Sequence, residues 1–151
     1  MIGNITKELP ERLVGFLRPG APGLLLSCGA DAYPSSAYTW VMVSSAKRLR
    51  FGVDQGGSAM TNIDRSGQAS LQIIGPGNVV FLIKGQARKI KERIAAAEPA
   101  SIALYEMEVI GAKDQSWPGV STTALCYEWP AENRAAMLKM EQEVYAEMRD
   151  A

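Results

Sequence analysis

A glycine turn followed by a hydroxyl side chain and the start of a helix is the segment of this sequence best suited to chemistry. Gly56-Gly57 precedes Ser58, and the pattern predicts a helix over residues 58–66 that Gly67 ends. Free backbone amides at the start of that helix, with the hydroxyls of Ser58 and Thr61, could hold a phosphate group. A plainer interpretation is that Ser58 caps the helix and the glycines make a turn. The local pattern alone favours the plainer interpretation.

The composition excludes several other kinds of active site. The 151 residues include no histidine, so the commonest general base, metal ligand and partner of a nucleophilic serine is missing. The two cysteines, Cys28 and Cys126, lack the spacing of a disulfide framework or a zinc site, and we expect both to be buried as small apolar side chains. No catalytic residue and no metal site are assigned. Any reaction is therefore expected to depend on a cofactor.

Charge and hydropathy narrow the class of protein further. The 16 basic and 16 acidic side chains create no overall field that would attract nucleic acid or an anionic membrane. Apolar runs such as residues 79–83 are far shorter than the roughly 20 residues that a membrane-spanning helix needs. Residues 1–6 have neither a basic leader nor an apolar signal core. We expect a single cytoplasmic domain over residues 1–151, with no nucleic-acid or membrane partner.

The elements that must position the glycine turn are mostly strands. The fold class predicted is mainly β with α, an antiparallel β-barrel of six or seven strands whose first three strands form a meander. Helices are expected at the N-terminus, in the middle and at the C-terminus, over residues 7–17, 58–66 and 131–149, the last with a methionine-rich face. Strands are expected over residues 24–29, 36–44, 48–53, 69–74, 79–90, 101–113 and 120–129.

Several short sequences follow one another along the chain in an order typical of one superfamily. They are Tyr38-Thr39-Trp40-Val41, Leu49-Arg50-Phe51-Gly52-Val53, Ser58, Asn62-Ile63, Gly85 and Trp117-Pro118-Gly119. In order and spacing the chain resembles, over nearly its whole length, the FMN-binding split barrels of the pyridoxamine 5′-phosphate oxidase-like superfamily. The resemblance implies a homodimer with FMN in a groove at the two-fold interface and the flavin phosphate near the helix after the third strand.

The resemblance also assigns roles to individual residues. Ser58 and Thr61 would bind the flavin phosphate, and the backbone from Tyr38 to Val41 would run beside the ring system. Trp117 is a further candidate for the pocket lining because, unlike Trp129, it lies in a loop-like Trp-Pro-Gly context. The candidate cofactor-binding residues are Tyr38, Thr39, Trp40, Val41, Val53, Asp54, Ser58, Met60, Thr61 and Trp117.

Two positions depart from the family pattern. Members that bind FMN firmly often have Lys or Arg two residues after the serine, where this chain has Met60, and an arginine where it has Tyr38. Each missing cation would remove a phosphate contact of about 1.5 to 3 kcal/mol. Two functions stay open. One is an FMN-binding flavoprotein, a flavin-dependent oxidoreductase with an unknown redox substrate. The other is a non-catalytic split-barrel dimer that binds a deazaflavin, haem or no cofactor.

Overall fold

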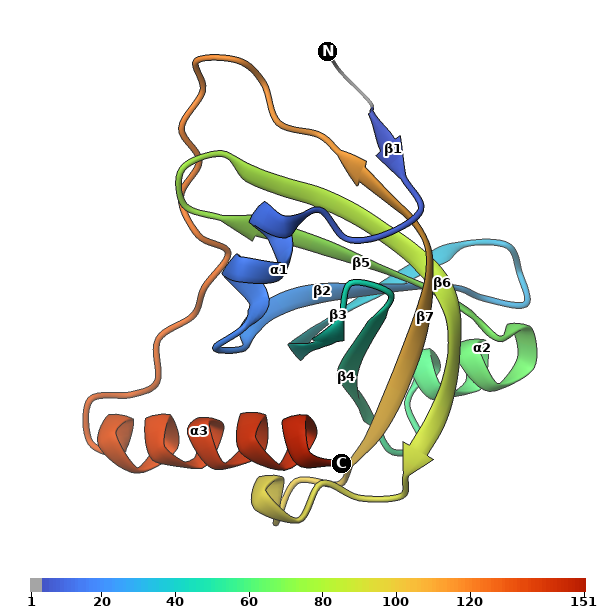
Figure 1. Ribbon diagram of the computed structural model, residues 1–151. Helices are drawn as coiled ribbons and strands as arrows, with labels where there is room; N and C mark the ends of the chain where they lie inside the picture. The colour runs from blue at the N-terminus through green and yellow to red at the C-terminus, as the bar shows by residue number, and fades with distance from the viewer. Residues whose placement is uncertain (1–3) are drawn as a thin grey trace.

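Six antiparallel strands close into a barrel, with helices against its outside and over one end (Figure 1). The structure is a computed structural model and describes residues 4–151. In chain order the elements are β1 (Ile5–Thr6), α1 (Glu11–Leu17), β2 (Ala21–Cys28), β3 (Pro34–Ser45), β4 (Arg48–Asp54), α2 (Ser58–Ser66), β5 (Gln68–Gly75), β6 (Val79–Lys91), the 3₁₀ turn η1 (Ala95–Ala97), β7 (Ile102–Asp114) and α3 (Arg134–Asp150).

The strand order shows how the barrel closes. Strands β2, β3 and β4 form the predicted meander, but β5 pairs with the other edge of β2 rather than with β4. The chain makes this crossing through α2, which packs against β2, β3 and β4. Strand β7 then pairs with both β4 and β6 and closes the ring, while the short β1 extends the sheet beside β7. The predicted antiparallel barrel with three helices is confirmed.

Alternation of apolar residues explains why these segments are strands with one buried face. In β5 the side chains of Ala69, Leu71 and Ile73 point into the barrel, and the residues between them are partly exposed. Helix α1 covers one end of this core with Leu13 and Leu17 (Figure 1). Apolar burial on this scale is the main source of stability for a domain of this size.

A second, smaller core lies outside the barrel, between β3, β7, η1 and α3. It contains Trp40, Met42, Val144 and Met148, all of them buried. The methionine-rich face predicted for the last helix therefore packs, in part, against the outer surface of this barrel. Among the described residues, none of the helices combines the length and the hydropathy needed to cross a membrane.

Three predictions about local structure were wrong. Residues 120–129 form no strand, and they instead run past the end of the β5–β6 hairpin with single backbone hydrogen bonds such as Leu125 N to Ile74 O at 2.9 Å. Cys28 and Cys126 are exposed, because the first lies on the outward face of β2 and the second in this irregular segment. Helix α2 is capped by Gly57, and the Ser58 side chain makes no capping hydrogen bond.

Candidate functional site

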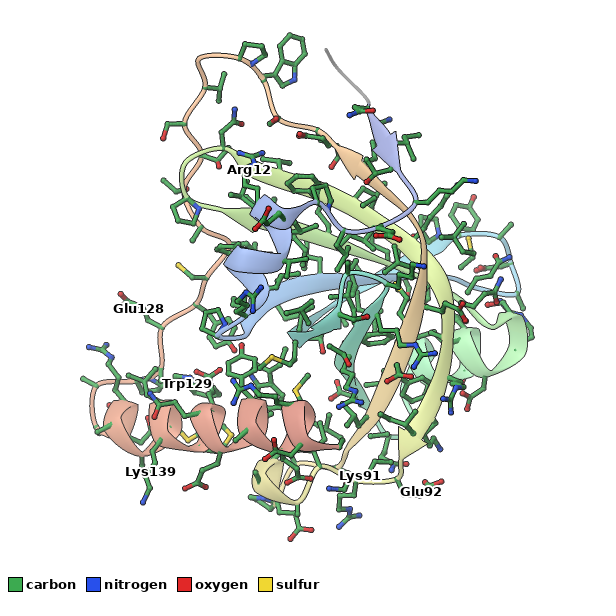
Figure 2. The ribbon with its side chains drawn as sticks, viewed as in Figure 1. Arg12, Lys91, Glu92, Glu128, Trp129 and Lys139 are labelled. Atoms are coloured by element: carbon green, nitrogen blue, oxygen red, sulfur yellow. The ribbon has the colours of Figure 1, made fainter. Side chains whose placement is uncertain are left out.

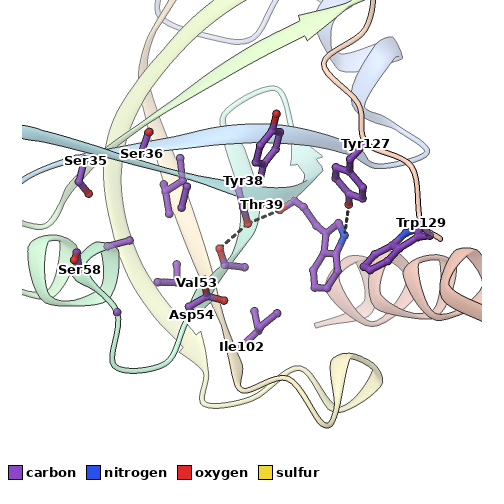
Figure 3. A pocket seen from close by; sticks show the side chains of 16 residues that line it. Ser35, Ser36, Tyr38, Thr39, Val53, Asp54, Ser58, Ile102, Tyr127 and Trp129 are labelled. Atoms are coloured by element: carbon purple, nitrogen blue, oxygen red, sulfur yellow. Dashed lines mark hydrogen bonds between the residues drawn. The ribbon is translucent and has the colours of Figure 1, made fainter.

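A cavity of about 400 Å³ opens where β3 and β4 separate (Figure 3). The ladder between these strands ends at the pair Val41 and Phe51, beyond which β3 pairs only with β2, and β4 only with β7. The Thr39 hydroxyl bridges the gap and donates to the Gly52 carbonyl at 2.6 Å. The cavity is lined by Leu25, Ser35, Ser36, Ala37, Tyr38, Thr39, Trp40, Gly52, Val53, Asp54, Gly57, Ser58, Ala59, Ile102, Tyr127 and Trp129.

One end of the cavity is the N-terminus of α2. Gly57, Ser58 and Ala59 line it, and the backbone turns into the helix at Gly57 with φ −85° and ψ 174°. The first amides of a helix have no partner within the helix, and they carry the positive end of its dipole. Because the Ser58 hydroxyl is not used as a cap, it is available beside these amides. This end of the cavity therefore suits an anionic or hydrogen-bond-accepting group.

The other end of the cavity is aromatic. The ring of Tyr127 lies edge-on to Tyr38 at a centroid distance of 6.0 Å and to Trp129 at 5.7 Å. The Trp40 indole Nε1 donates to the Tyr127 hydroxyl at 3.0 Å (Figure 3). Edge-to-face geometry of this kind stabilises aromatic pairs. This end therefore suits a flat apolar ring.

A carboxylate on α3 stands behind the aromatic end. Glu141 accepts hydrogen bonds from Trp40 Nε1 at 2.8 Å, from Trp129 Nε1 at 3.0 Å and from the Tyr127 hydroxyl. Burial first, and then the hydrogen bond to Glu141 and its charge, raise the pKa of Tyr127 above its ordinary value of 10.0. Tyr127 therefore remains a neutral donor at physiological pH.

Charge in the lining is sparse and negative. Among the residues described, neither Lys nor Arg lines the cavity, and Asp54 is its one carboxylate. A bound phosphate would therefore depend on the α2 amides and on neutral hydroxyls. Such contacts are weaker than those with a cation by about a factor of two.

Comparison with known proteins identifies the architecture. No known protein-family model matches the chain, and no curated protein matches its sequence. Among solved structures, a pyridoxamine 5′-phosphate oxidase-like protein from Lactobacillus delbrueckii has a TM-score of 0.60 at 18% identity, covering 74% of this chain and 98% of that one. An F420 reductase has a TM-score of 0.58 at 16% identity, covering 71% and 100%. HupZ of Group A Streptococcus has a TM-score of 0.52 at 12% identity, covering 67% and 89%.

The chain has the split-barrel fold of the pyridoxamine 5′-phosphate oxidase-like proteins. At these identities the likeness concerns the fold, so the ligand of this split barrel has to be inferred from its own residues.

Most of the residues proposed from the sequence come together in the cavity, and four lie outside its lining. Val41 is buried in the barrel core, and Met60 packs partly buried against that core. The Thr61 hydroxyl points back to the Gly57 carbonyl at 3.4 Å. Trp117 is 57% exposed in a loop held by the Asn78 side chain. The proposed residues that do line the cavity are Tyr38, Thr39, Trp40, Val53, Asp54 and Ser58.

Sequence reasoning missed the aromatic wall contributed by the end of the chain. Tyr127 was not proposed, and Trp129 was given less weight than Trp117 because residues 120–129 were expected to form a strand. An aromatic, proline and acidic run just before the last helix is the one signal that marks this segment. Nothing in that run indicates that it reaches a cavity formed by residues about ninety positions earlier in the chain.

Proposed function

We propose that this split barrel is an FMN-binding flavoprotein that acts as a flavin-dependent oxidoreductase. The observation that carries the proposal is the polarity of the cavity, with the α2 N-terminus at one end and the Tyr127 and Trp129 rings at the other. FMN has the same polarity, a flat ring system joined to a phosphate. The F420 reductase with the same fold supports redox chemistry on a flavin-like ring.

Each end of the cavity would have a distinct task toward the flavin. The amides of Ser58 and Ala59 and the Ser58 hydroxyl would hold the phosphate. The apolar side chains of Val53 and Ile102 and the aromatic wall would pack around the ring system and exclude water. A bound flavin supplies the hydride and electron transfer, so the absence of histidine from the chain is compatible with this chemistry.

A second candidate is a non-catalytic split barrel that binds a deazaflavin, haem or another planar ligand. One feature of the lining favours this alternative. Asp54 is negatively charged, and no cation in the described lining of the cavity would neutralise the charge of a phosphate. Among planar ligands, an uncharged one such as a deazaflavin ring without a phosphate would avoid repulsion from Asp54. It would use the same aromatic wall.

We further propose that the protein acts as a homodimer. Tyr38 lines the cavity and is nevertheless 59% exposed, so in one protomer the cavity is open on this side. Tyr33 and Ile110 are also exposed, at 75% and 51%, and a second protomer would cover apolar area of this kind. Sedimentation is expected to give twice the protomer mass of 16.3 kDa, and a mass of 16.3 kDa at micromolar concentration would contradict the proposal.

The absorption spectrum of the freshly purified protein, followed by titration, tests the function. We expect a flavin spectrum, or binding of added FMN with quenching of its fluorescence, and reduction of the bound flavin by NADH or NADPH under anaerobic conditions. Binding without reduction by any donor would favour the non-catalytic alternative. A colourless protein that ignores FMN, riboflavin and a 5-deazaflavin would refute flavin binding, and a Soret band would indicate haem instead.

A further inference from the structure

The aromatic wall of the cavity has little support from its own backbone. It belongs to residues 115–133, which contain no strand and no helix before α3 starts at Arg134. The last backbone hydrogen bond from this segment to the barrel is Leu125 N to Ile74 O at 2.9 Å. Tyr127 and Trp129 lie beyond that bond, so their orientation depends on side-chain contacts. Figure 2 shows Trp129 next to α3 at the end of this segment.

We propose that Glu141 is the positioning residue of this wall: its carboxylate holds Trp40, Tyr127 and Trp129 in the arrangement that receives a ligand ring. The inference rests on the proposed flavin site, which supplies the ring. Both carboxylate oxygens are engaged, Oε2 by Trp40 and Tyr127 and Oε1 by Trp129. Within residues 4–151 no Lys or Arg forms an ion pair with Glu141, so three neutral donors satisfy its charge.

This arrangement determines which surfaces face the cavity. The two indole N–H groups and the tyrosine hydroxyl are all directed at Glu141. They are therefore not available to a ligand, and the rings contribute apolar surface to the lining. An acceptor on α3 thereby makes this wall suitable for stacking, although Glu141 itself does not line the cavity.

A purely structural role, in which Glu141 only anchors α3, does not account for the geometry. Helix α3 has other anchors, because Val144 and Met148 are buried in the outer core. Its last carbonyls, those of Met148 and Arg149, accept hydrogen bonds from Arg50 at 2.8 and 3.1 Å. We therefore expect α3 to remain docked when Glu141 is changed, whereas the Tyr127 and Trp129 side chains lose their common acceptor.

Nuclear magnetic resonance of the three tryptophan indole groups tests the inference without a ligand. Trp117 is exposed and makes no indole hydrogen bond among the described residues, so it provides an internal reference. In the wild type, the Trp40 and Trp129 N–H signals should lie downfield of the Trp117 signal and exchange slowly with solvent. In Glu141→Gln one carboxylate acceptor becomes an amide donor. At least one of the two signals should then move upfield and exchange faster.

A second variant and a control complete the experiment. Glu141→Ala should shift both signals, and Glu143→Gln, an exposed position on the same helix, should shift neither. Unchanged Trp40 and Trp129 signals in Glu141→Ala, or loss of α3 helicity in both Glu141 variants, would overturn the positioning role. If Glu141→Ala does not fold, the indole signals of the isosteric Glu141→Gln variant test the positioning role instead.

Ligand binding gives the functional measurement. Both Glu141 variants should lower the affinities for riboflavin and FMN by the same factor, about tenfold, because the wall contacts the ring that the two ligands share. Equal affinity in wild type and variants, despite shifted indole signals, would refute a role toward the ligand. If the wild type binds no flavin, the proposed function fails, while the indole signals still show whether Glu141 orders the wall.

Discussion

The Arg50 guanidinium donates through Nε to the Glu106 carboxylate at 3.1 Å and joins β4 to β7 beside the end of α3. Both side chains are largely buried, with 13% and 10% of their surface exposed. The same guanidinium donates through Nη1 to the Met148 and Arg149 carbonyls of α3. One side chain thus connects two barrel strands with the helix that carries Glu141.

Replacing Arg50 should therefore be costly. In Arg50→Met, Glu106 keeps only the contact with Arg88 at 3.6 Å, and we expect a loss of about 3 kcal/mol in the free energy of unfolding. The Arg88 side chain is 74% exposed, so Arg88→Met should change stability by about 0.5 kcal/mol or less. Urea unfolding of both variants measures the difference. Equal losses in the free energy of unfolding would show that the buried ion pair of Arg50 and Glu106 contributes no more than the exposed contact of Arg88.

Two glycines should respond to alanine in opposite directions. A Cβ at Gly85 would lie 2.2 Å from the Glu108 carbonyl oxygen, where the register between β6 and β7 shifts. Gly85→Ala should destabilise the protein by about 2 kcal/mol or more, because backbone has to move. Gly15 is exposed in α1 with free space around it, so Gly15→Ala should stabilise by about 0.5 to 1 kcal/mol. Thermal unfolding distinguishes the two, and a stable Gly85→Ala would contradict the close approach of these strands.

Acid should weaken the attachment of α3 through Glu147. Burial alone would raise the pKa of this carboxyl, but hydrogen bonds from Lys91 and from the Ala96 and Ala95 amides outweigh burial and hold it below the ordinary value of 4.5. Because the pKa is lower in the folded chain, Glu147 stabilises the fold above about pH 4.5, and this stability disappears as the pH falls through the folded-state pKa.

The stability difference between wild type and Glu147→Gln should therefore be largest near neutral pH and shrink in acid. Unfolding curves recorded across that range measure it. Glu143→Gln, at an exposed position on the same helix, serves as the control. A difference that stays constant with pH would mean that the charge of Glu147 does not contribute.

The phosphate end of the cavity can be tested with two hydroxyl deletions. Ser58 lines the cavity, so Ser58→Ala should lower the affinity for FMN about 2- to 10-fold and leave the affinity for riboflavin nearly unchanged. The Thr61 hydroxyl is directed at Gly57, so Thr61→Ala should affect neither ligand. Titrations following flavin fluorescence give the affinities of wild type and both variants for the two ligands. A loss that is the same for FMN and riboflavin would place the phosphate elsewhere.

Local sequence determined the strands and one half of the site. Runs rich in β-branched, aliphatic and aromatic residues predicted every barrel strand, and Gly67, in a left-handed conformation with φ 71°, ends α2 where it was expected to. The residues of β3, β4 and the start of α2 lie within about 25 positions of one another. The family resemblance assigned this contiguous stretch to the cofactor, and the folded chain brings most of it together because consecutive elements are usually neighbours in space.

The other half of the site was decided by the tertiary structure. Residues 120–129 have the composition of a strand, but in the folded chain they form no ladder with any strand. They instead cross the end of the β5–β6 hairpin and bring Tyr127 and Trp129 to Trp40 and Glu141. No local pattern encodes such a meeting, because it depends on barrel closure and on where α3 docks, which involve contacts between residues far apart in the chain.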